Sequence, residues 1–118
     1  MLSKINRLKK RYQFNYVYKA GNHFSGRFMV LYTTTSKTKS IKVGFAVTKK
    51  LGKAFQRNLI KRRLREVVRV QLPNLKQNYN IIVVAKEGIL DATHENLEVE
   101  FVNLIKKADL FKNDEKNI

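Results

Sequence analysis

Residues 43–69 read VGFAVTKKLGKAFQRNLIKRRLREVVR, and two different periodicities meet within them. Residues 42–48 alternate large apolar side chains with smaller or polar ones, which predicts a β-strand. Residues 55 to about 71 instead carry apolar side chains at helical spacing, which predicts an α-helix that ends near Pro73. With each residue turned by about 100°, the apolar face of this helix consists of Ile60, Leu64, Val67 and Val68. That face is expected to pack in the core.

The adjacent side of this helix and the loop before it are strongly basic. Nine Lys and Arg residues but a single acid, Glu66, lie between Lys49 and Arg69, so ion pairs within the helix cannot explain the charge. Glu66 itself is expected to form an ordinary ion pair, and Arg63 and Leu59 lie off both faces. Arg binds phosphate oxygens in pairs, and Lys adds point charges. The candidate polyanion-binding residues are Lys49, Lys50, Lys53, Arg57, Asn58, Lys61, Arg62, Arg65 and Arg69.

The whole chain is expected to form one α+β domain, residues 1–118. The predicted elements are a helix over about residues 12–20, strands over 27–34, 42–48 and 81–85, and helices over 55–71 and 93–110. Gly21 is a good stop for the first helix. The order is α-β-β-α-β-α, with a further short strand as an option, and it predicts an α/β sandwich of one mainly antiparallel sheet with helices packed on it. A basic lead-in, residues 1–11, and a frayed tail, residues 112–118, flank the domain.

The charge of the chain is unevenly distributed. The net charge is +16, all nine acids lie after residue 65, and the first 65 residues hold 18 of the 25 Lys and Arg. A polyanion would relieve this self-repulsion while releasing its own counterions. Nucleic acid is therefore the expected partner. An anionic membrane is the competing one, but no strongly apolar amphipathic face is left over to enter it.

Two simple features bear on location. The chain has no cysteine, which excludes disulfides and thiolate metal sites and suits a reducing cytoplasm. Its longest apolar runs, residues 28–32 and 81–85, are far shorter than the roughly 18 residues needed to span a bilayer. We therefore expect a cytoplasmic protein without a membrane partner.

Residues 57–66, RNLIKRRLRE, resemble the basic helix of the bacterial ribonuclease P protein family. The resemblance is collinear over about residues 7–107. It includes RLKK at 7–10, Phe14, Val17 and Gly21, RFMVLY at 27–32, VGFAVTKKLGKA at 43–54 and IIVVA at 81–85. Several elements in the family's order are a more specific signal than a basic helix alone.

The resemblance implies a role as well as a fold. It implies a left-handed crossover between the parallel strands that flank the basic helix, against the general right-handed rule. It further implies an accessory protein subunit that binds the catalytic ribonuclease P RNA, one protein per RNA, and that is a monomer in isolation. The RNA, using Mg²⁺ that it binds itself, would remove the 5′ leader of precursor tRNA.

The resemblance also implies a cleft for the single-stranded leader between the first helix and the sheet. Carried over by position, the leader-binding residues are Lys10, Phe14, Tyr18 and Tyr32. Aromatic faces stack on any base and a cation follows the backbone, so such a cleft tolerates different sequences. From the residues alone, Phe14 and Tyr32 would be assigned to the core. Tyr18 stands where the family commonly has Phe.

The chain offers no catalytic or metal site of its own. Its basic half has no carboxylate cluster of the kind that holds metal ions in protein nucleases, and His23 and His94 have no nucleophile or acid motif nearby. The alternative function is a ribosomal or other structured-RNA-binding protein, and a more distant one is a DNA-architectural protein.

Overall fold

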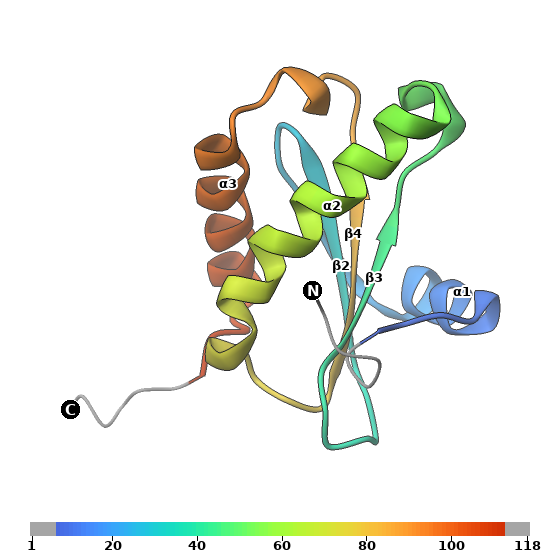
Figure 1. The fold of residues 1–118 in the computed structure, drawn as a ribbon. Coiled ribbons are helices and arrows are strands. Elements are labelled where there is room, and N and C mark those ends of the chain that lie inside the picture. Colours follow the sequence, from blue (N-terminus) through green and yellow to red (C-terminus); the bar gives the residue numbers. More distant parts are fainter. Residues whose placement is uncertain (1–6, 113–118) are drawn as a thin grey trace.

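The structure, a computed structural model, describes residues 7–112, so most of the predicted lead-in and the tail beyond residue 112 lie outside the described residues. A four-stranded sheet is packed against three α-helices (Figure 1). The elements are α1 (Arg11–Ala20), β1 (Asn22–Ser25), β2 (Met29–Thr35), β3 (Lys42–Ala46), α2 (Ala54–Gln71), β4 (Tyr79–Ala85) and α3 (His94–Lys107). Short 3₁₀ turns precede α2 and follow it, and a third precedes α3. The predicted α+β class and element order are confirmed, and β1 is the optional short strand.

The sheet has the strand order β1-β2-β4-β3. The pairs β1–β2 and β2–β4 are antiparallel, whereas β3 and β4 are parallel, so the sheet is mainly antiparallel as predicted. Helix α2 makes the connection between the two parallel strands. Seen with α2 in front of the sheet and both strands running upward, β4 lies to the left of β3, which is a left-handed crossover (Figure 1).

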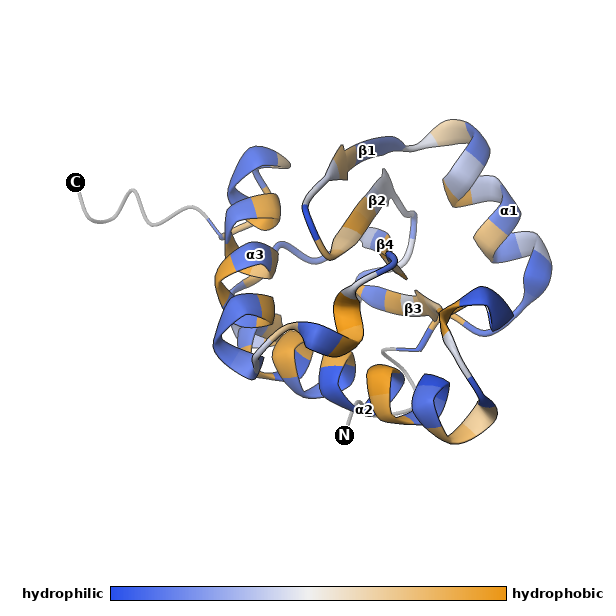
Figure 2. Cartoon of the chain, turned by 90° about the horizontal axis from the view of Figure 1, so that it is seen from above, coloured by the Kyte–Doolittle hydropathy of each residue, from blue (hydrophilic) through white to orange (hydrophobic). Residues whose placement is uncertain are grey.

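Strand β4 is apolar on both faces, and both faces are covered. Ile81, Val83 and Ala85 belong to the main core, together with buried residues of α2 and α3. Ile82 instead packs with Val17 of α1 and with Leu8. Viewed from above, α1 lies on one side of the sheet, and α2 and α3 lie on the other (Figure 2). Burial on both faces explains why the apolar run at residues 81–85 is uninterrupted.

Gly21 ends α1 as predicted, but close packing is the reason, because its backbone is extended (φ −90°, ψ 171°). A Cβ at this position would lie 2.3 Å from the carbonyl oxygen of Thr33 and 2.7 Å from that of Val17. Both are backbone atoms, which cannot move aside as a flexible side chain would. The glycine is therefore needed for the close approach of the helix end to β2.

Some predicted boundaries were wrong by two or three residues. The last helix ends at Lys107 and not at residue 110, since the chain turns at Asp109 in the left-handed region (φ 58°) and buries Leu110. Strand β3 ends at Ala46, where the chain leaves the sheet for the turn before α2, and β4 begins two residues before the predicted start. Strand β2 begins at Met29 and not at Arg27, because a carboxylate binds the intervening backbone.

That carboxylate is Glu100 of α3. It accepts three backbone hydrogen bonds at the start of β2, from the N–H groups of Arg27 (2.8 Å), Phe28 (2.7 Å) and Met29 (2.8 Å). Hydrogen bonds to an ionised acceptor are stronger than neutral ones. Through these hydrogen bonds, Glu100 links the turn between β1 and β2 to α3.

Replacing Glu100 by Gln should lower the free energy of unfolding by about 2 kcal/mol, since the neutral amide cannot accept with both ends. Urea denaturation would measure the loss. Glu87→Gln is the matched control, because Glu87 is exposed in a loop, and it should change stability by less than about 0.5 kcal/mol. Equal stability of the two variants would contradict the role assigned to Glu100.

Candidate nucleic-acid interface

Helix α2 divides into an apolar side and a basic side as predicted. Ile60, Leu64, Val67 and Val68 are all buried in the main core, and Leu59 is 37% exposed, in keeping with its position off the apolar face. Arg57, Lys61 and Arg65 are partly buried. The predicted polyanion-binding residues that are largely exposed are Lys49, Lys50, Lys53, Asn58, Arg62 and Arg69.

The N-terminus of α2 has no side-chain cap. Its N-cap residue is Lys53, whose side chain has no hydrogen-bond acceptor, and the first turn contains no acid. Gln56 accepts the backbone N–H of Lys53 (2.8 Å), and the guanidinium of Arg57 donates to the carbonyl oxygen of Gly52 (3.2 Å). Gly52 itself has φ 142°, a conformation that favours glycine. The first-turn amides of α2 are therefore not occupied by a side-chain cap.

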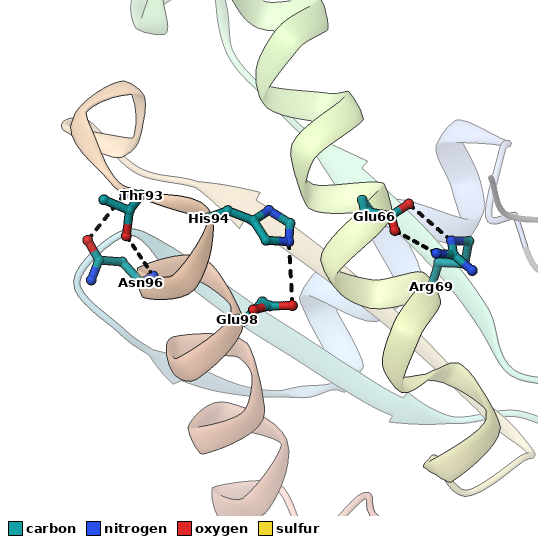
Figure 3. Close-up of polar contacts among 6 residues, drawn as sticks. All are labelled: Glu66, Arg69, Thr93, His94, Asn96 and Glu98. Carbon is teal, nitrogen blue, oxygen red and sulfur yellow. Dashed lines mark hydrogen bonds and ion pairs between the residues drawn. The ribbon is translucent and has the colours of Figure 1, made fainter.

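Helix α3 begins in the opposite way. The hydroxyl of Thr93 accepts the backbone N–H of Asn96 (3.0 Å), and the amide oxygen of Asn96 accepts the N–H of Thr93 (3.2 Å), as Figure 3 shows. Glu95 adds an acid to the first turn. An internal cap of this kind stabilises a helix without any ligand. The start of α2 is therefore suited to an external anion, and the start of α1, where Lys10 is the N-cap and the first turn contains no acid, is built in the same way.

Two arginines of α2 are engaged within the protein. Arg69 donates two hydrogen bonds to the carboxylate of Glu66, at 3.0 Å and 2.5 Å, which confirms the ordinary ion pair expected for Glu66 (Figure 3). These hydrogen bonds hold the pKa of Glu66 below its usual value. Arg63, which lies off the basic arc, donates to the carbonyl oxygen of Ala92 in the segment before α3.

An aromatic cluster covers the face of the sheet on which α1 lies. The ring centroids of Phe14 and Tyr18 are 6.4 Å apart, and those of Tyr18 and Tyr32 are 4.9 Å apart, edge to face. Three of the four residues predicted to line a cleft are therefore brought together. Burial and then the neighbouring Tyr32 raise the pKa of Tyr18, which keeps its hydroxyl neutral. Lys10 is exposed at the N-cap of α1.

Gly44 of β3 makes room for this cluster. A Cβ on Gly44 would lie 2.4 Å from the Phe14 ring. The ring therefore lies against bare backbone of the sheet, which only glycine allows at this distance. Phe14 is partly buried as a result, with part of its ring left accessible.

An open pocket of about 270 Å³ connects the aromatic cluster with the basic helix. Phe14 and Gly44 form part of its wall, and Lys61 and Arg65 of α2 form another part. Its remaining lining residues are Arg7, Leu8, Lys9, Val43 and Phe45. Phe14 of the predicted cleft thus meets Lys61 and Arg65 of the predicted basic set in one hollow at the β3 edge of the sheet, although they are about fifty positions apart in the sequence.

The chain is similar to known proteins over nearly its whole length. The family model named Ribonuclease P matches residues 2–109. The ribonuclease P protein component of Natranaerobius thermophilus is 36% identical over 111 residues, which cover 94% of this chain and 96% of the relative. That of Syntrophomonas wolfei is 34% identical over 118 residues, covering 100% and 99% of the two chains. This chain belongs to the Ribonuclease P protein family.

Solved structures of the Ribonuclease P protein family agree with the fold. The Staphylococcus aureus RNase P protein superposes with a TM-score of 0.83 at 33% identity, covering 91% of this chain and 98% of the other. The RNase P protein of Thermotoga maritima gives a TM-score of 0.78 at 24% identity over 86% and 96% of the two chains, which supports the fold alone.

Sequence reasoning missed three residues of the interface in this member of the Ribonuclease P family. Arg7 and Lys9 line the pocket because the segment before α1 pairs with β3, where the N–H of Leu8 donates to the carbonyl oxygen of Val43 (2.9 Å). The Nε of Arg7 is buried without a partner among the described residues. His23 lies 5.6 Å from Tyr32, centroid to centroid. The basic run at residues 7–10 was a usable signal for the first two, whereas nothing local indicated His23.

Within residues 7–112, no group of three His, Cys, Asp or Glu side chains could hold a metal ion. Over the same part of the chain, no helix is both long and apolar enough to span a membrane.

Arg63→Ala should lower the free energy of unfolding by about 1.5 kcal/mol, because it removes a charged donor from the carbonyl oxygen of Ala92. Its neighbour Arg62 is exposed, so Arg62→Ala should change stability by less than about 0.5 kcal/mol. Thermal or urea denaturation of both variants would make the comparison. A larger loss of stability for Arg62→Ala than for Arg63→Ala would contradict the structural role assigned to Arg63.

Proposed function

We propose that this chain is the protein subunit of a bacterial ribonuclease P, which binds the catalytic RNA and the 5′ leader of precursor tRNA. Membership of the Ribonuclease P family supports the subunit role in tRNA 5′ processing. The observation that carries the finer proposal is the pocket in which Lys61 and Arg65 meet Phe14. A cationic helix and a stacking ring that share one hollow suit a site where two RNA strands come together.

The catalytic RNA would lie along the basic side of α2 and the turn before it. Lys61 and Arg65 line the pocket, and Arg57 lies near the start of α2, where its guanidinium donates to the carbonyl oxygen of Gly52. The first turn of α2 contains no acid. An RNA phosphate at the uncapped first turn would accept the free amides and gain from the helix dipole. Arg69 is already paired with Glu66, so it would bind RNA only by sharing or leaving that carboxylate.

The leader would stack on the aromatic cluster. Phe14, Tyr18 and Tyr32 offer ring faces and edges to successive bases, and Lys10 and Lys9 provide charge for the backbone. Base stacking on aromatic side chains depends little on sequence. A subunit that must accept many different leaders needs this tolerance.

Catalysis would come from the RNA with its own Mg²⁺. The acidic residues of the described chain do not form a metal-binding group, so no step of hydrolysis is assigned to this protein. We further propose one protein per RNA, a monomeric free protein and a cytoplasmic location. A ribosomal or other structured-RNA-binding role is the alternative, and the family match favours the ribonuclease P subunit over it.

The direct test is cleavage of a 5′-labelled precursor tRNA by a bacterial ribonuclease P RNA at low Mg²⁺, with and without the protein. The protein should restore cleavage at the mature 5′ end and show none alone. Phe14→Leu keeps an apolar side chain but removes the stacking ring, and should weaken precursor binding by about tenfold. Val99→Ala, an exposed site on α3, should behave as wild type.

Each result has a distinct meaning. Tight RNA binding without stimulated cleavage would favour the alternative of a general RNA-binding protein. Stimulation that Phe14→Leu leaves unchanged would retain the subunit role and exclude the ring as a leader contact. Weaker binding of mature tRNA by the same variant would also argue against a leader-specific contact, because mature tRNA has no leader.

Glu66→Gln should strengthen binding of the catalytic RNA and make its salt dependence steeper. Loss of the carboxylate frees Arg69 for one more phosphate, which should increase the magnitude of the slope of log K against log salt by about 1. Filter binding over a range of salt concentrations would measure it. Glu98→Gln on α3 is the control and should leave the slope unchanged. An unchanged slope for Glu66→Gln would mean that Arg69 does not reach the RNA.

A further inference from the structure

Two tyrosines on the outer side of α1 are not explained by the fold or by the cleft. Tyr12 is 68% exposed and Tyr16 is 59% exposed, the largest exposed fractions among the described tyrosines. Within residues 7–112, neither ring contacts another aromatic ring. A ring left in water adds little stability, and Tyr is a poorer helix former than Lys, Arg or Gln.

The two rings form one surface. With each residue turned by about 100°, Tyr12 and Tyr16 lie about 40° apart, one turn from each other, and opposite Phe14 on the helix. Side chains with this spacing are neighbours, with Cβ atoms about 6 Å apart. Viewed from above, one side of α1 faces the sheet, and no other helix or strand lies against its outer side (Figure 2).

The charge around the rings selects the kind of partner. Lys19 lies on the same side of α1, and Arg11 lies between that side and the aromatic cluster; both are exposed. No acid occurs anywhere in the first 65 residues, so nothing on α1 neutralises these cations. Exposed aromatic rings interleaved with unpaired cations are suited to single-stranded nucleic acid. A second copy of this chain would bring like charge against like charge.

We propose that Tyr12 and Tyr16 form a second stacking surface for the precursor leader, which binds nucleotides further from the cleavage site than those in the cleft. This rests on the proposed function, because the leader must first occupy the cleft. The aromatic cluster begins at the pocket with Phe14 and continues through Tyr18 to Tyr32, between α1 and the sheet. Nucleotides beyond it pass the flank of α1 and reach its outer side, where Arg11 and Lys19 hold the backbone.

The test compares precursors with a short and a long leader, roughly 4 and 16 nucleotides, which span the site sizes of single-strand-binding domains. Their affinity is measured with the holoenzyme reconstituted from a bacterial ribonuclease P RNA. Tyr12→Ala/Tyr16→Ala should weaken binding of the long-leader precursor by roughly tenfold, and of the short-leader precursor by less than about twofold. Tyr12→Phe/Tyr16→Phe keeps the rings and should bind as wild type. Val99→Ala is the control for an exposed apolar site elsewhere.

A second arm identifies stacking as the interaction. A long leader whose distal nucleotides lack bases should bind the wild type as weakly as it binds the double alanine variant. Equal loss for short and long leaders would place the rings against the catalytic RNA and overturn the proposal. A lower melting temperature of the double alanine variant in isolation would overturn it too, because the rings would then serve the fold.

Failure of this inference is distinguishable from failure of the proposed function. If the wild-type protein does not stimulate cleavage at all, the subunit role itself is wrong. If cleavage is stimulated and depends on Phe14, but the advantage of the long leader survives Tyr12→Ala/Tyr16→Ala, only the second surface is excluded.

Discussion

Strand β4 lies between β2 and β3 and is apolar on both faces, and the rest of the architecture follows from the need to cover it. Its pairing with β3 is parallel, so the chain must return from one end of the sheet to the other, and α2 makes that connection. Helices α2 and α3 cover one face, and α1 with the segment before it covers the other. Strand β4 pairs with β2 along its whole length, Tyr79–Ala85, and with β3 over residues 80–84, so most backbone polar groups of this central strand are satisfied within the sheet.

The same arrangement creates the interface. Helix α1 covers its face only partly, so the rings of Phe14, Tyr18 and Tyr32 remain accessible beside it, and Gly44 lets one ring lie on the sheet. Helix α2 lies on the opposite face, but its basic side turns toward the β3 edge. The edge is where the pocket joins the two sets of residues. Covering one strand from both sides therefore brings a stacking surface and a cationic surface to a common border.

The acids complement this division of the molecule. Glu100 binds the backbone at the start of β2, and Glu66 neutralises Arg69 at the far end of the basic helix. Glu100 stabilises the fold, and Glu66 pairs with one cation of the basic helix. Neither carboxylate pairs with a cation of the pocket or of the first turn of α2. The first 65 residues of the free protein thus carry 18 Lys and Arg without an acid among them, and a bound polyanion would reduce the repulsion between these cations.

The sequence by itself determined the element order, the apolar face of α2 and the excess of cations, because these depend on spacing and composition within short windows. It also indicated the basic helix as the binding element. From the residues alone it assigned Phe14 and Tyr32 to the core, whereas both are only partly buried, since a ring half covered by a neighbouring element has the same local pattern as a buried one. Through the family resemblance alone it indicated the left-handed crossover, which general rules oppose. Only the tertiary structure decided that Arg7 and Lys9 meet Lys61 and Arg65, that His23 reaches Tyr32, and that Arg63 is a structural donor. Each of these is a contact between segments far apart in the chain, and such contacts are set by how helices and strands pack rather than by any local property of the residues.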